Sequence, residues 1–306
     1  MPNFARINAT DGAADYANVV LWEAGEDGAD YGVKTVGICE DFYTLTANIQ
    51  FRNGFINGFE LIALAGQEAK VSDITYGAGF GDGTGTTYNI DMRVSNGEFT
   101  NLRVQGKFYS TGDTRQNTKI ENCVTTGFYN EVFIYNTALI NTLAFGVFLA
   151  RNDNASISNS TLIYNGSSIV VRSRNATTTV TVNNSVAFSS GGADGFNSLN
   201  GGLYLGDYNA ANNAGSTPGA NSITNLSIVA SNVFTNPAGG DYSPKVGGPL
   251  DGASSTGGFI GAVDLGGGGI SIGVTEAGPS FTESINTSLS VNITGAIVEN
   301  GPAFTE

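Results

Sequence analysis

One phrase decides the fold of this chain, and its copies read FTNLRV (99–104), KIENCV (119–124), LINTLAF (139–145), SISNSTLIY (156–164), VTVNNSVAF (180–188) and SITNLSIV (222–229). Each copy is an alternating β-type segment that reaches an asparagine and continues at once into a second apolar run. The copies recur at steps of roughly 20 residues, followed by two longer steps, and such a period marks solenoid proteins. Their asparagines are Asn101, Asn122, Asn141, Asn159, Asn184 and Asn225.

Strands this short cannot bury an apolar face alone, because each turn of the repeat offers only two or three segments of about three to six residues. Wound into rungs that stack at about 4.8 Å, they pair in parallel with equivalent strands above and below. The sequence therefore predicts an all-β fold, a right-handed parallel β-helix (solenoid) with an N-terminal cap and a small C-terminal β module. The columns expected to face inward are Ile120, Val124, Ile134, Leu143, Leu149, Ile157, Leu162, Val170, Val182 and Val186.

The asparagines are expected at the corners of the rungs. Asparagine tolerates the left-handed backbone conformation that a tight corner requires, and its side-chain amide can bond to the equivalent residues of neighbouring rungs. A second column ends a different β phrase, of which VFIYN (132–136) is the first copy. The asparagines of this column are Asn136, Asn152, Asn175 and Asn209.

Composition excludes several classes of function. The chain has no histidine, which rules out a Ser-His-Asp triad and a histidine-ligated zinc site. A net charge of −14 argues against nucleic-acid binding, which needs a basic surface. No apolar run approaches the length of a membrane span, so we expect no membrane insertion. The two cysteines, Cys39 and Cys123, are far apart and read as buried free thiols, and we expect neither a metal nor a cofactor.

Three regions follow from the repeat. Residues 1–84 do not carry it and are expected to form the N-terminal cap and the first rungs, with Trp22 as the apolar plug of the open end. Residues 85–264 are expected to form the parallel β-helix, which stops where prolines exclude a central strand. Residues 265–306 alternate every second residue and predict a small antiparallel β module that serves docking or oligomerisation.

Two inserts break the rhythm of the repeat, at 189–202 and 209–222. Inserts in a solenoid emerge as loops on one side of the stack, which is often the functional face. A mixed group of carboxylates and aromatics in this region suits a carbohydrate-binding groove, whereas the simpler interpretation is a solvated loop whose aromatics fold over the barrel. The candidate ligand-binding residues are Asp194, Phe196, Tyr204, Asp207 and Tyr208.

Two stretches resemble known β-helix proteins. NVFTNPAGGDYSPKVGGPLDGAS (232–254), followed by FIGAVD (259–264), resembles the closing motif of right-handed β-helix proteins of the pectate-lyase-like superfamily, although Leu250 stands where Ala-Ile usually precedes the Asp. The opening DYANVVLWEAGEDGAD (15–30) resembles that of β-helix proteins of tailed-phage virions. Together the two stretches cover about a quarter of the chain. The resemblance implies a virion setting and a homotrimer, and neither motif carries an activity.

The resemblance and the N-terminal sequence lead to one expectation of role. MPNFARINATDG lacks a signal peptide, which fits a protein made in a host cytoplasm and carried to the virion surface by assembly. We therefore expect a non-enzymatic virion structural protein, namely a capsid decoration, head knob or fibre component. Its partners would be other virion proteins and copies of itself, with host surface glycans as a further possibility.

The alternative is a tailspike-like polysaccharide hydrolase or lyase, or a glycan-binding adhesin, that uses the groove beside loops 189–222. Hydrolysis needs two carboxyl groups about 5–10 Å apart, and Glu131 with Asp153 is one candidate pair. β-Helix lyases use calcium held by several Asp residues together with an arginine base. The remaining candidate groups are Arg151, Arg172, Arg174, Glu121 and Asp207.

Overall fold

The computed structural model describes most of the chain up to Asp264. The described residues are 4–51, 55–82, 88–92, 94–109, 117–128, 137–150, 154–166, 170–173, 176–198, 201–213 and 217–264. Residues 1–268 form one compact unit and residues 269–306 a second. The predicted C-terminal module at 265–306 lies outside the described residues and remains a prediction.

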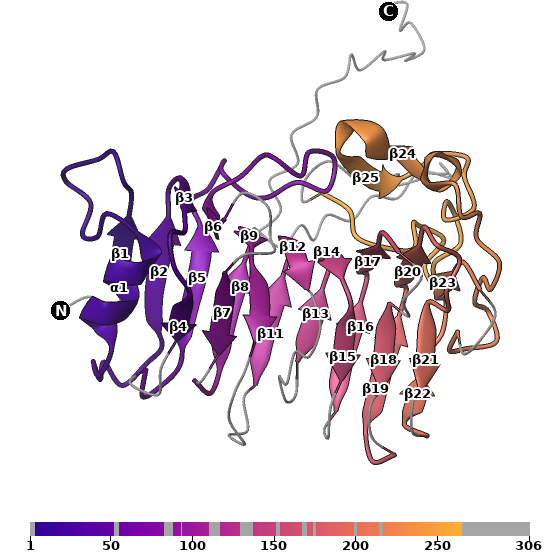
Figure 1. Ribbon diagram of the computed structural model, residues 1–306, viewed down its shortest axis with the longest axis horizontal. Helices are drawn as coiled ribbons and strands as arrows, with labels where there is room; N and C mark the ends of the chain where they lie inside the picture. Colours follow the sequence, from indigo (N-terminus) through magenta and orange to yellow (C-terminus); the bar gives the residue numbers. More distant parts are fainter. Residues whose placement is uncertain are drawn as a thin grey trace, which may run out of the picture. The chain divides into compact units, whose positions relative to one another are not determined.

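The first unit is a right-handed parallel β-helix, as the repeat predicted (Figure 1). Each rung contributes one strand to each of two long sheets, and shorter strands form a third side. Sheet A consists of β1 (Phe4–Ile7), β2 (Thr35–Cys39), β5 (Phe59–Ala63), β8 (Gly97–Thr100), β11 (Thr118–Glu121), β13 (Ala138–Ile140), β16 (Ala155–Ser158), β19 (Thr179–Asn183) and β22 (Leu203–Leu205). Sheet B consists of β3 (Phe42–Thr44), β6 (Gly79–Gly81), β9 (Arg103–Gln105), β12 (Val124–Phe128), β14 (Leu143–Gly146), β17 (Thr161–Tyr164), β20 (Val186–Ser189) and β23 (Ala210–Ala211).

The third side is built in two parts. Sheet C contains β4 (Ile49–Phe51), β7 (Asn89–Met92) and β10 (Lys107–Tyr109), and sheet D contains β15 (Phe148–Ala150), β18 (Val171–Ser173) and β21 (Phe196–Ser198). All pairings within these four sheets are parallel and follow the repeat, as in Lys119 opposite both Glu98 and Ala138. In each copy of the repeat, the segment before the asparagine is therefore a strand of sheet A, and the apolar run after it is a strand of sheet B.

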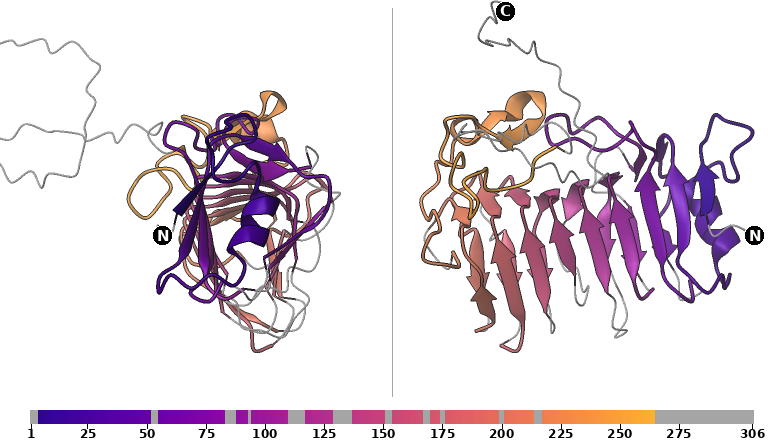
Figure 2. Two further views of the ribbon diagram at one scale, coloured as in Figure 1. Left: turned by 90° about the vertical axis from the view of Figure 1, so that its left-hand side faces the viewer. Right: turned by 180° about the vertical axis from the view of Figure 1, so that it is seen from behind.

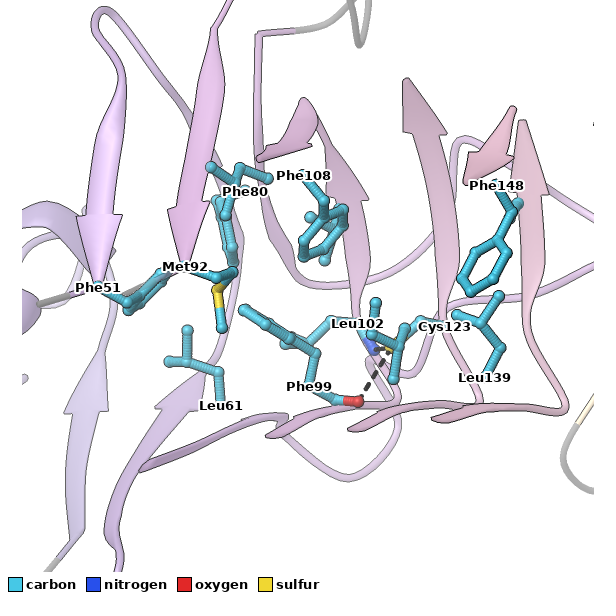
Figure 3. Packing of buried hydrophobic residues seen from close by; sticks show 14 of the residues in the cluster. Phe51, Leu61, Phe80, Met92, Phe99, Leu102, Phe108, Cys123, Leu139 and Phe148 are labelled. Carbon is cyan, nitrogen blue, oxygen red and sulfur yellow. Dashed lines mark hydrogen bonds between the residues drawn. The ribbon is translucent and has the colours of Figure 1, made fainter. Parts of the chain in front are cut away.

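The interior changes character along the stack. Its N-terminal half is a chain of aromatic rings: the Phe51 and Phe59 centroids lie 4.6 Å apart, Phe59 and Phe99 5.4 Å, and Phe99 and Phe108 5.3 Å (Figure 3). Aromatic pairs at these separations add to the stabilisation that burial alone gives. The C-terminal half is mainly aliphatic, with Phe148 and Phe196 as its buried aromatic residues. Its fully buried residues include Ile157, Leu162, Val170, Val180 and Val182.

The corner asparagines adopt the left-handed conformation that the sequence predicted. Asn101, Asn122, Asn141, Asn159 and Asn184 have φ between 45° and 62°. At the next rung Tyr208 takes this position with φ 57°. The prediction was wrong for Asn225, which lies outside the strands and is not among the residues with positive φ. The placement in the second column was wrong for Asn209, because its strand β22 belongs to sheet A and Asn209 follows the corner residue Tyr208. Asn136, Asn152 and Asn175 lie outside the described residues.

A buried polar ladder runs just inside these corners. The residue after each left-handed position accepts a hydrogen bond from the equivalent backbone N–H of the preceding rung: Thr142 N donates to Ser160 Oγ, Ser160 N to Ser185 Oγ, and Ser185 N to Asn209 Oδ1, each over 3.1 Å. Cys123 extends the ladder, with its sulfur 3.4 Å from Leu102 N (Figure 3). Buried polar groups that are fully paired fix the register of their neighbours.

The outer face of sheet B is covered by residues 226–264, which we call the cover segment. It contains a short antiparallel hairpin, β24 (Phe234–Asn236) with β25 (Asp241–Pro244), and two 3₁₀ turns, η1 (Ala230–Asn232) and η2 (Pro237–Gly239). Apolar side chains of the cover segment pack on those of sheet B, as in Phe188 on Phe234 with ring centroids 5.4 Å apart. The resulting second core cluster is separate from the interior.

This cover corrects part of the sequence prediction. Val124, Leu143 and Val186 were predicted to face inward, but they belong to the second core cluster on the outer face of sheet B. The physical reason is that sheet B is buried on both faces, so alternation does not distinguish its sides. The inward placement was correct for Ile120, Ile157, Leu162, Val170 and Val182, whereas the side chains of Ile134 and Leu149 lie outside the described residues.

Hydrogen bonds tie the end of the cover segment to successive rungs. Gly261 N donates to Asn184 O, Ala262 N to Thr161 Oγ1, and Val263 N to Asn141 Oδ1, each over 2.9 Å. Asp264 then accepts hydrogen bonds from Val71 N and from the N–H and hydroxyl of Ser72. The cover segment therefore crosses the rungs in the direction of the N-terminus and joins elements more than a hundred residues apart.

Helix α1 (Val19–Glu26) closes the N-terminal end (Figure 2, left). Its Trp22, which the sequence predicted as the apolar plug, is fully buried, and its ring lies 5.3 Å from that of Phe55 and 6.0 Å from that of Phe59. Gly37 makes room for the indole, because a Cβ on Gly37 would approach it to 2.9 Å.

The open edge of β1 is also protected. Tyr16 N donates to Arg6 O, and Asn8 N donates to Tyr16 O, both over 3.0 Å, while Arg6 N donates to the Asp15 carboxylate. An edge whose backbone groups are used in this way cannot template a further strand. The first rung is therefore closed both at its interior and along its backbone.

Candidate functional site

The predicted aromatic residues of the ligand-binding group complete the interior. Phe196 is fully buried, and its ring packs edge-on against that of Tyr204 with centroids 6.2 Å apart. The Tyr204 hydroxyl lies 2.8 Å from Asn197 O and 3.1 Å from Val171 O, and its single proton can be donated to either carbonyl. Burial raises the pKa of Tyr204, so the phenol stays protonated and remains a donor. Tyr204 therefore ties the last strand of sheet A to sheet D across the C-terminal end of the interior.

The two predicted carboxylates each bind a nearby asparagine. Asp207 accepts hydrogen bonds from Tyr208 N and Asn221 N, both over 2.8 Å, and from Asn221 Nδ2 over 2.6 Å. The hydrogen bond from the Asn221 backbone lowers the pKa of Asp207, which is therefore an ionised acceptor that closes the loop between residues 207 and 221. Asp194 accepts a hydrogen bond from Asn197 Nδ2 over 2.7 Å.

The structure thus brings four of the five residues together in two pairs, and Asp194 bonds Asn197 instead. Phe196 contacts Tyr204, and Asp207 holds the backbone of Tyr208, whose φ of 57° places it at a corner. Of the three aromatic rings that were expected to stack on a sugar, Phe196 has no exposed surface. The hydrogen bonds of Asp194 and Asp207 organise their own loops.

Among the described residues, the other catalytic candidates do not form a pair of neighbouring carboxyl groups. Glu131, Asp153, Arg151 and Arg174 lie outside the described residues. Glu121 is on the outer face of sheet A, where it forms an ion pair with Lys119. Arg172 is partly buried on β18, in register with Leu149 and Asn197 on the neighbouring strands.

A shallow hollow of about 280 Å³ lies on the outer face of sheet A, and sequence reasoning did not find it. Lys34 pairs with Glu98 beside it, and the Glu121 carboxylate raises the pKa of the Lys119 ammonium. Both lysines are paired with glutamates, so the two ion pairs leave no net charge to attract an ionic ligand. It also offers no aromatic ring for a sugar. Its lining residues are Lys34, Asn96, Glu98, Asn117, Thr118, Lys119 and Ala138.

The thiols are protected by burial. Burial raises the pKa of Cys39 and of Cys123 to about 12, so neither is a thiolate at neutral pH. Cys123 instead donates to Glu121 O over 3.2 Å as a member of the polar ladder. Within the described ranges, no group of three or more Asp, Glu, Cys or His side chains is arranged to hold a metal ion. The helices in those ranges are all too short or too polar to span a bilayer.

Comparison of the chain with protein-family models, with curated proteins and with solved structures finds no match. The fold therefore rests on the strand pairing described above. Function has to be argued from the site and the surface, because a β-helix hosts many unrelated activities.

Proposed function

We propose that this chain is a non-enzymatic structural protein of a virion, in the class of capsid decorations, head knobs and fibre components. The observation that carries the proposal is the use of the candidate site residues: Phe196 and Tyr204 close the interior, and Asp207 closes a loop. Side chains that build the scaffold in this way are not preorganised for a substrate. The virion setting is supported by the sequence resemblance of the opening motif, whereas the closing motif supports only the fold.

The architecture suits a protein whose task is to persist and to present a surface. Apolar residues are buried in two clusters, one inside the coil and one between sheet B and the cover segment. The outer face of sheet A, by contrast, carries polar and charged side chains such as Lys119 and Ser156. We propose that sheet A is the face presented to the medium or to neighbouring copies in a homotrimer.

Quantitative mass spectrometry of purified particles tests this proposal. The proposal expects the chain in many copies per particle, in fixed ratio to the major capsid or tail protein. Absence of the chain from particles made by cells that express it would refute the proposed role.

Activity against polysaccharides tests the enzymatic and adhesive alternatives. The purified chain is expected to release no reducing ends or unsaturated products from a broad panel of capsular and cell-wall polysaccharides, and to bind none of them. Cleavage that is abolished in Asp207→Asn, while Asp194→Asn remains active and both variants stay folded, would replace the structural proposal with a tailspike-like enzyme.

A further inference from the structure

Helix α1 buries Val19 and Trp22, as an ordinary surface helix would, but it also buries acidic side chains and exposes apolar ones. Its two glutamates are buried: Glu23 and Glu26 are 9% and 8% exposed. The Glu26 carboxylate accepts hydrogen bonds from Tyr16 and Tyr31 hydroxyls, over 2.8 and 2.7 Å. The solvent side of the helix instead carries Val20 and Leu21, which are 37% and 52% exposed. A surface helix normally turns its polar residues outward.

Two further apolar side chains of the N-terminal cap are also exposed. Val33, which follows the helix, is 53% exposed, and Ile56, in the turn before β5, is 60% exposed. The turn is fixed to the cap, because Phe55 packs on Trp22 and Asn57 Nδ2 donates to Asp30 over 2.9 Å. We call Val20, Leu21, Val33 and Ile56 the cap patch. Grouped exposed apolar side chains of this kind mark interaction sites.

The cap patch is set in a strongly acidic region. Residues 4–41 contain eight Asp and Glu residues against two basic residues, a net charge of −6 out of −14 for the whole chain. Asp15, Asp27 and Asp30 are among the exposed acids around the helix. An occupant of this end must therefore combine an apolar centre with a positive rim, since like charges at a rim oppose docking.

Neither residues 265–306 nor the opposite end of the stack has this charge pattern. Residues 265–306 contain four glutamates and no lysine or arginine. The opposite end of the stack, from 176 to 232, carries Asp194 and Asp207 and again no lysine or arginine. A second N-terminal end repeats the charge of −6. An anionic lipid surface is repelled for the same reason.

We infer that the N-terminal end of the stack is the docking end of the molecule, and that its cap patch binds another protein whose apolar surface is ringed by lysine or arginine. The inference rests on the proposed structural role in one respect: it takes the bound protein to be a component of the same particle. In this arrangement the molecule attaches to the particle through α1, and the outer face of sheet A remains exposed.

Photo-crosslinking in the cells that produce the chain tests the inference. A benzophenone amino acid replaces Leu21 in one variant and Leu205 in a matched control. Leu205 is also an exposed leucine, at 45%, but it lies on β22 at the opposite end. The adduct at position 21 is expected to contain one other protein, crosslinked within an apolar segment flanked by basic residues, and the control is expected to lack this adduct. In particles, Leu21→Ser should lower incorporation by about tenfold relative to Leu205→Ser, as for loss of an interface anchor.

The outcomes separate this inference from the proposed function. If the adduct at position 21 joins a basic-rimmed protein that is not a particle component, the docking end stands and the virion role fails. Crosslinking at position 21 to a second copy of this chain or to lipid, or equal adducts from positions 21 and 205, overturns the inference. So does equal incorporation of the two serine variants. Circular dichroism of both serine variants establishes that the fold is retained.

Discussion

Sheets A and B are built from the same rungs, yet the outer face of sheet A is exposed and the outer face of sheet B is buried. In sheet A most outward residues in the middle of the stack are polar and at least partly exposed, as in Glu121, Ser156 and Thr181. Strand β13 is an exception, because Ala138 and Ile140 face outward there. In sheet B the outward residues include Leu143 and Phe188, which are buried under the cover segment. Stability therefore depends on both faces of sheet B but only on the inner face of sheet A, and the outer face of sheet A is free to vary.

The difference is visible in the sequence once the two sheets are separated. Strands of sheet A alternate between apolar and polar residues, as in TVTVN (179–183), whereas strands of sheet B are nearly continuous apolar runs, as in VAFS (186–189). Alternation indicates one buried face, and a continuous run indicates two. The predictions below test this contrast, from the largest expected effect to the smallest.

Phe188→Ala tests whether the outer face of sheet B is a true core. Phe188 is 1% exposed and packs on Phe234, so its truncation should lower the free energy of unfolding by about 3–5 kcal/mol, as for a core phenylalanine. Denaturant titration measures this value. The control Ser156→Ala, on the exposed face of sheet A, should change it by no more than about 0.5 kcal/mol. Similar small losses in both variants would mean that the cover segment does not pack as described.

Two substitutions at Asn141 separate the energetic contribution of the corner conformation from that of the bonds to the cover segment. Its side chain bonds both the N–H and the carbonyl of Val263 over 2.9 Å, and its φ is 45°. Asn141→Ala should cost about 2–3 kcal/mol, because it loses these bonds and places alanine in the left-handed region. Asn141→Gly loses only the bonds and should cost about 1 kcal/mol less than alanine. Equal costs, from thermal or chemical denaturation, would show that corner strain does not contribute.

Ser160→Ala probes the polar ladder. The substitution removes the acceptor of Thr142 N inside a buried corner and should lower the free energy of unfolding by about 1–2 kcal/mol. The matched control is Ser158→Ala, two residues earlier and on the outer face of sheet A, which should be nearly neutral. A neutral Ser160→Ala would mean that the ladder does not hold the register of the rungs.

Glu121→Gln should have the smallest effect. Glu121 pairs with Lys119 on the outer face of sheet A, where solvent screens the interaction, and loss of this pair should change the free energy of unfolding by about 0.5 kcal/mol or less. Chemical denaturation at low and at high salt checks the value. A loss above about 2 kcal/mol would indicate that this face is buried against another surface.

More of the fold than of the candidate site could be predicted from the sequence. The spacing of Asn101, Asn122, Asn141, Asn159 and Asn184 predicted the corners, because only a few residue types accept positive φ. The cover segment was missed because alternation cannot tell an inward from an outward residue in a strand buried on both faces. A better signal was present in the residues after the asparagines, where Cys123, Thr142, Ser160 and Ser185 form a column of small polar side chains.

The candidate ligand residues were harder to interpret from sequence. Tyr204 lies between two leucines in LYL (203–205), and an apolar strand of this kind would normally turn its leucines inward. In the structure Leu203 and Leu205 are exposed and Tyr204 points inward, because its hydroxyl meets backbone carbonyls at the end of the interior. The register of this strand is set by its pairing with β19, which sequence alone does not give.

Native-state hydrogen exchange tests the central claim most directly, namely that the cover segment and sheet B form one cooperative unit. Peptides from residues 250–264 should exchange with the same opening free energy as those from β14, β17 and β20, because they share a core and hydrogen bonds. Rapid exchange of residues 250–264, while these strands stay protected, would contradict the account.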